Sequence, residues 1–133
     1  MDAFFAALYE LITGQSDLAF ILYEEGGFYL TVGLLMSLLS LAGMALYYIV
    51  IDHPAYIRCF HWLLMMVVVG LINFAIAYFM ADGVVFSIYG TTSGFVTQII
   101  TFGISNVVWT LVFSFVFSMC LKWKSNNCSH TPF

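Results

Sequence analysis

A row of polar side chains runs along an apolar stretch near the C-terminus, and its spacing is the chemical signal that stands out in the sequence. At helical spacing between residues 95 and 121 stand Gln98, Thr101 and Ser105 in one row and Asn106, Thr110, Ser114 and Ser118 in another. Such a stripe can line a water-filled path, or it can pack against helices, because Ser and Thr hydroxyls can bond to the carbonyl four residues earlier. We favour packing, because bulky Phe113, Phe115 and Phe117 alternate with smaller residues and spread around the helix.

Potential metal ligands lie close together around residue 54. His53, Cys59 and His61 follow Asp52 within a short segment, and all are residue types that bind metals. Their spacing matches no zinc pattern. We therefore predict no metal site and no cofactor here, and expect interfacial histidines and a reduced thiol.

A stretch rich in glycine and hydroxyl groups occupies residues 90–94, with the sequence Gly-Thr-Thr-Ser-Gly. Carbonyl-lined ion filters share this composition, but a potassium-type filter follows a pore helix, and the residues from Val84 onward are too few to form one. We predict an ordinary turn, with Thr91, Thr92 or Ser93 capping the helix that follows.

Three long apolar runs must position all of these residues. They cover residues 27–51, 59–80 and 95–121, and none contains Asp, Glu, Lys or Arg. The chain of 133 residues is 63% hydrophobic and 8% charged. Because about 20 apolar residues cross a bilayer core as a helix, we predict a single-domain, all-α integral membrane protein with three transmembrane helices. The absence of charge within the runs argues against a pump or an ion-coupled transporter.

Small residues mark one face of each of the first two runs. Such residues let helix backbones approach closely in lipid, so we predict helix packing or an oligomer interface there. The residues concerned are Gly33, Ser37, Ser40 and Gly43 in the first run and Gly70, Asn73 and Ala77 in the second.

The few cations predict the orientation. Arg58 lies between the first two runs, and Lys122 and Lys124 follow the third, so with three spans all of them lie on one side. The positive-inside rule makes that side the cytoplasm. Aromatic residues near the run ends, such as Tyr48 and Trp62, agree with interfacial positions. We expect a bacterial inner (cytoplasmic) membrane protein with an external N-terminus and a cytoplasmic tail at 122–133.

The segment 1–25 carries a weaker helical pattern. Its apolar residues recur at helical spacing as Phe4, Phe5, Leu8, Leu11 and Ile12. The sequence Gly14–Asp17 interrupts the pattern, and Ser16 or Asp17 can cap a second short helix. Insertion would bury Glu10 in lipid, so we predict an amphipathic helix along the outer interface. It either lies on lipid alone or docks on a neighbouring subunit.

The functional expectation is an assembly role. No catalytic, cofactor or nucleotide motif is visible, so we expect no enzyme activity, and three Lys plus Arg against a net charge of −4 exclude a nucleic-acid surface. We predict a structural or assembly subunit of an oligomeric membrane complex, of secretion, conjugation or injection type. Its partners are then the bilayer, other copies of itself and other membrane subunits. The alternatives are an oligomeric pore lined by the third helix and an immunity or regulatory protein that binds another membrane protein.

Overall fold

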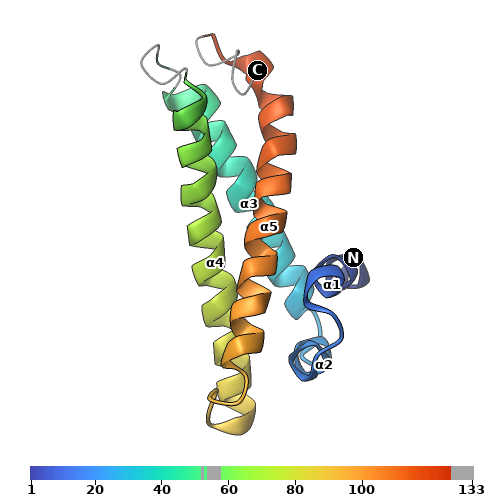
Figure 1. The fold of residues 1–133 in the computed structure, drawn as a ribbon. Coiled ribbons are helices and arrows are strands. Elements are labelled where there is room, and N and C mark those ends of the chain that lie inside the picture. The colour runs from blue at the N-terminus through green and yellow to red at the C-terminus, as the bar shows by residue number, and fades with distance from the viewer. Residues whose placement is uncertain (52, 54–57, 127–133) are drawn as a thin grey trace.

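Where the structure describes it, the chain is almost entirely helical (Figure 1). The structure is a computed structural model that describes residues 1–51, 53 and 58–126. Two short helices come first, and three long ones follow. The helices are α1 (Asp2–Thr13), α2 (Asp17–Glu24), α3 (Phe28–Ala45) with its π-helical continuation η1 (Leu46–Ile51), α4 (Cys59–Tyr89), and α5 (Val96–Leu121) with its 3-10 continuation η3 (Lys122–Lys124).

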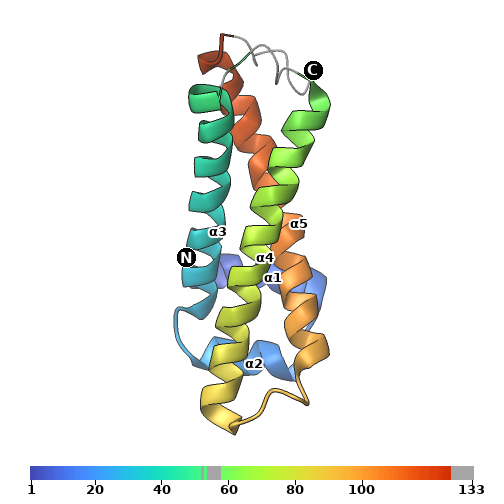
Figure 2. The ribbon, with the colours of Figure 1, turned by 90° about the vertical axis from the view of Figure 1, so that its left-hand side faces the viewer.

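The three long helices run side by side and form one bundle (Figures 1 and 2). With their continuations they cover Phe28–Ile51, Cys59–Tyr89 and Val96–Lys124, and each is long and apolar enough to cross a membrane. The all-helical fold with three potential spans is therefore as the sequence predicts.

The second long helix extends further than expected. It continues beyond residue 80 to Tyr89, because no proline interrupts the stretch and Asp82 and Gly83 remain helical. The helix ends at Gly90, whose φ of 69° is a left-handed conformation that glycine adopts without steric cost. The connection to α5 is therefore a short turn at one end of the bundle.

The capping expected in that turn is wrong. Phe95 is the N-cap of α5 and makes no side-chain capping bond. Thr91 instead accepts a hydrogen bond from the backbone N–H of Ser93 at 3.4 Å, within the turn itself. The hydroxyl groups therefore stabilise the turn rather than the helix that follows.

The cationic residues gather at one end of the bundle. Arg58 immediately precedes α4, and Lys122 and Lys124 lie in η3, at the end opposite the α4–α5 turn (Figure 1). Arg58, Lys122 and Lys124 therefore lie on the same side of the bundle, as expected from the sequence. Residues 127–133 of the expected tail, and Asp52 beside His53, lie outside the described residues.

The bundle buries several polar side chains and exposes many large apolar ones. Large apolar side chains such as Leu38, Leu71 and Phe79 are exposed on its surface. Soluble proteins rarely expose so much contiguous apolar surface, whereas helices in lipid pack through small and polar residues. The buried polar side chains of the three long helices are Ser40, Asn73, Ser105, Asn106, Thr110, Ser114 and Ser118.

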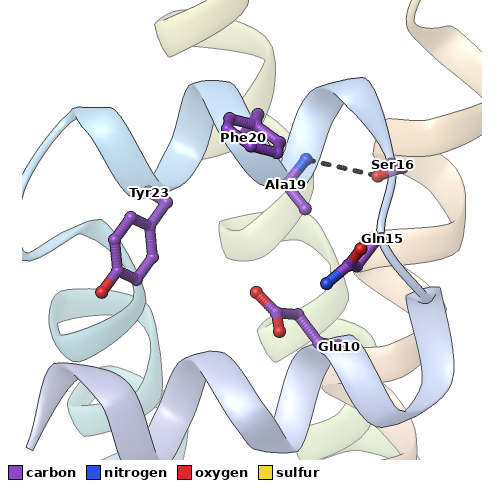
Figure 3. Close-up of a pocket in the computed structure, with 6 residues that line it drawn as sticks. All are labelled: Glu10, Gln15, Ser16, Ala19, Phe20 and Tyr23. Carbon is purple, nitrogen blue, oxygen red and sulfur yellow. Dashed lines mark hydrogen bonds between the residues drawn. The ribbon is translucent and has the colours of Figure 1, made fainter.

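The N-terminal helices pack on their own chain. Helix α1 crosses α3 and α5, a surface that neither alternative for this segment anticipated. Of the predicted apolar stripe, Phe5 is buried together with Tyr9, whereas Phe4 is 60% and Leu11 is 77% exposed. The predicted cap of α2 is confirmed, since the hydroxyl of Ser16 accepts a hydrogen bond from the backbone N–H of Ala19 at 3.2 Å (Figure 3).

The contact between α1 and α3 depends on Gly33. A Cβ atom at this glycine would lie 2.2 Å from Cδ1 of Phe5, so the Phe5 ring rests directly on the α3 backbone. We expect Gly33→Ala to displace α1 and to lower the unfolding free energy by about 1–3 kcal/mol through overpacking. Thermal unfolding in detergent measures the loss. Gly83→Ala is the control, because a Cβ there has nothing within 4 Å, and equal stability of both variants would contradict the contact.

Candidate functional site

A buried asparagine joins three helices. The side-chain N–H of Asn106 donates to the backbone carbonyl of Asn73 at 2.8 Å, and its Oδ1 accepts from the Tyr9 hydroxyl at 2.5 Å. The three residues are each 1% exposed, and they come from α5, α4 and α1. We call them the amide node. It fixes the first helix of the chain to the middle of the bundle.

Aromatic groups surround the amide node. The Tyr9 ring centroid lies 4.8 Å from that of Phe102 and 5.7 Å from that of Tyr29. Burial raises the pKa of the Tyr9 phenol, and the neighbouring Tyr29 raises it further, so Tyr9 remains a neutral donor. The indole N–H of Trp109 donates to the carbonyl of Leu8 at 2.7 Å and gives α1 a second attachment to α5.

A second polar contact closes the cationic end of the bundle. The hydroxyl of Ser118 accepts from the indole N–H of Trp62 at 2.8 Å and shares a hydrogen bond of 2.5 Å with the Tyr48 hydroxyl. Tyr48 and Trp62 were expected as interfacial aromatics, yet both are buried. A buried Tyr or Trp needs a partner for its polar tip, and the polar row of α5 supplies it.

Most of the polar residues predicted to form rows on α5 are therefore buried within the chain. Thr110 donates to the carbonyl of Asn106 at 2.7 Å, and Ser114 is buried. In the other row, Gln98 accepts from the backbone N–H of Leu18 at 2.9 Å, so it holds the first turn of α2. Thr101 and Ser105, from the same row as Gln98, are half-buried and buried.

The predicted packing residues meet neighbours within the same chain. Ser37 and Ser40 return their hydroxyl bonds to the carbonyls of Gly33 and Met36. A Cβ at Gly43 would lie 2.4 Å from Cγ2 of Val69, and one at Gly70 would lie 3.5 Å from Cγ1 of Val107. Asn73 and Ala77 are buried on α4. The small residues thus pack α3, α4 and α5 together.

The possible metal ligands do not converge. His53 and Cys59 are exposed and His61 is half-buried. Within residues 1–51, 53 and 58–126, no group of three His, Cys, Asp or Glu side chains is arranged to hold a metal ion. Asp52 lies outside that part of the chain.

A pocket of about 270 Å³ opens between α1 and α2. In Figure 3 the carboxylate of Glu10 and the ring of Tyr23 point into the space between the two helices, and Gln15 lies near the turn that joins them. Ala19 is buried beneath it, whereas Phe20 and Tyr23 are exposed at its rim. Sequence reasoning missed this α1–α2 pocket, because the carboxylate lies on one helix and the aromatic rings on the other.

An apolar groove follows the seam between α3 and α4, the two helices nearest the viewer in Figure 2. It consists of two hollows of about 330 and 430 Å³ that share Met65 and Val68. No residue of α1, α2 or α5 lines this α3–α4 groove. Its lining is Leu39, Ala42, Gly43, Leu46, Tyr47, Ile51, His61, Leu64, Met65, Val68, Val69 and Ile72.

Comparisons with protein-family models, with curated proteins and with solved structures found no match for this chain.

The Tyr9 hydroxyl carries the attachment of α1. We expect Tyr9→Phe to lower the unfolding free energy by about 1–3 kcal/mol, because it leaves the buried Oδ1 of Asn106 without a donor. Amide hydrogen exchange in α1 should accelerate in parallel. Tyr89→Phe serves as the control, since Tyr89 is 54% exposed. A Tyr9→Phe protein as stable as this control would mean that the hydrogen bond contributes nothing.

Proposed function

We propose that the protein is a non-catalytic integral membrane subunit that crosses the bilayer three times and assembles with neighbouring membrane-spanning helices. The observation that carries this proposal is the α3–α4 groove, an open apolar hollow on the outer surface of a bundle whose polar groups are already packed within the chain. A neighbouring helix that fills such a groove gains close packing, which drives helix association in lipid.

The charge distribution supports a transmembrane placement. No charged residue occurs from Cys59 to Ala81 on α4 or from Val96 to Leu121 on α5, which leaves room for a hydrocarbon core of about 30 Å. Arg58 and the two lysines of η3 then lie at the cytoplasmic surface. Asp82 and the rest of α4 project from the opposite face.

This placement puts the N-terminal helices at the external surface. Asn106 precedes Lys122 by about 24 Å of helix, so the amide node and α1 lie just inside the far edge of the core. Gln98, which contacts α2, lies about 36 Å from Lys122 and therefore outside the hydrocarbon. The exposed Phe4 and Leu11 of α1 then face lipid, and the acids of α2 face water.

The contact surface proposed here differs from the Gly33 face that the sequence indicated. Phe5 covers Gly33 and Ser40 is buried, so these two residues already have partners in their own chain. Ala42, by contrast, is exposed and lines the groove. A small side chain at this point leaves space for a helix from a second copy or from another subunit.

The pore alternative is less well supported. Asn106, Thr110, Ser114 and Ser118 are at most 1% exposed within one chain. A pore formed between several chains would be lined by surface residues, and the surface of this bundle is apolar. A regulatory or immunity role remains compatible with the groove, and it differs from self-assembly in requiring one different partner protein.

The assembly proposal predicts a complex that depends on the groove. Native mass spectrometry after mild detergent extraction should give a mass above that of one chain: a multiple for self-assembly, or a defined mixed mass for another partner. We expect Ala42→Phe to reduce the complex at least tenfold by filling the groove. Leu38→Phe is the matched control, because Leu38 is 61% exposed and lies outside the groove. Monomers alone, from cells as well as after purification, would contradict the proposal.

The packed polar row predicts resistance to water-soluble thiol reagents. In a variant with the native cysteines replaced, Thr110→Cys and Ser114→Cys should remain unmodified by a charged maleimide, because neither position is exposed. Thr91→Cys, in the exposed α4–α5 turn, should react rapidly and is the control. Rapid labelling at both row positions in the intact assembly would instead support a water-filled lumen.

A further inference from the structure

We propose that the α1–α2 pocket binds an organic ammonium group. This role goes beyond assembly, because it requires no partner protein and uses residues far from the α3–α4 groove. The pocket combines a carboxylate with aromatic rings: Glu10 and Tyr23 point into it, and Phe20 contributes a second ring at the rim (Figure 3).

The lining favours a cation with a small apolar body. A carboxylate forms a charge-assisted hydrogen bond with an ammonium N–H, and the face of an aromatic ring attracts the same charge. The buried methyl of Ala19 and the two aromatic rings give apolar contact to the carbon atoms attached to the nitrogen.

The charged side chains of α1 and α2 are all acidic. No Lys or Arg precedes Arg58 in the chain, and Arg58 is the N-cap of α4, which begins at the far end of the bundle (Figure 1). Asp17, Glu24 and Glu25 are exposed on or beside α2. An anionic ligand is therefore repelled from this end of the molecule, whereas a cation is attracted.

Hydrogen bonds to the bundle hold both helices that form the pocket. Tyr9 and Trp109 fix α1 to the bundle, and the bond from Leu18 N–H to Gln98 fixes α2. Ser16 caps α2 at the turn that closes one end of the pocket. The carboxylate and the rings are thus positioned before a ligand arrives, which lowers the entropic cost of binding.

The placement of the pocket indicates two sources for the ammonium group. In the proposed membrane orientation, α1 lies at the edge of the hydrocarbon and α2 lies outside it, so the pocket opens at the level of the lipid headgroups. An ethanolamine phospholipid presents its ammonium group at that level. A soluble amine reaches the same pocket from the external solution.

Two binding measurements on the full chain distinguish these sources. The soluble arm titrates n-propylammonium chloride and follows the unfolding temperature in detergent, with 1-propanol as the uncharged analogue. The lipid arm measures, by native mass spectrometry, the retention of phosphatidylethanolamine against phosphatidylglycerol from mixed micelles. Each arm compares the unmodified protein with Glu10→Gln, Tyr23→Leu and the control Glu24→Gln, and circular dichroism confirms that each variant is folded.

We expect saturable binding of the ammonium compound in at least one arm, and the arm that responds identifies the source. Glu10→Gln should weaken it at least tenfold, Tyr23→Leu should weaken it less, and Glu24→Gln should leave it unchanged. Absence of binding in both arms, or equal binding by Glu10→Gln and the unmodified protein, would overturn the proposal. Because the assembly test uses Ala42 and oligomer mass, failure of one proposal leaves the other intact.

Discussion

The side-chain amide of Asn106 finds its hydrogen-bond partners on two other helices in the interior of the bundle, and the docking of α1 depends on them. A buried amide without partners destabilises a fold by several kcal/mol. One partner is the carbonyl of Asn73 on the adjacent long helix, and the other is Tyr9, which is 97 residues away in sequence. Satisfying one amide therefore brings the N-terminus back onto the bundle.

This docking determines which surfaces remain open. Helix α1 covers Gly33 and the adjoining face of α5, whereas the seam between α3 and α4 stays open. The same docking holds α1 along the outer edge of the proposed membrane, with α2 farther from the membrane centre. The space between these two helices is the pocket that contains Glu10. The proposed contact surface and the proposed binding pocket thus depend on one internal hydrogen-bond network.

Sequence patterns predicted the long helices well, but they did not predict which segments of the chain pack against them. Length and apolar composition are local properties, so the runs containing Gly33, Asn73 and Asn106 were found directly. The end of α4 was missed because Asp82 and Gly83 resemble a break, although the chain remains helical until Gly90 adopts positive φ. The docking of α1 on its own chain was not anticipated, because Tyr9 lies outside the apolar stripe although its hydroxyl has a partner inside the bundle. Tyr9 follows Phe5 by four residues, so the two side chains share the buried face of the helix.

A double-mutant cycle on Tyr9 and Asn106 tests most directly whether their hydrogen bond holds α1 on the bundle. Unfolding free energies are measured in one detergent for the unmodified protein, Tyr9→Phe, Asn106→Ala and the double variant. Contacting groups in a shared network give coupling energies of about 0.5–3 kcal/mol, so the double variant should lose less stability than the sum of the single losses. Strictly additive losses would show that the two side chains act independently, and α1 would then be held by apolar contact alone.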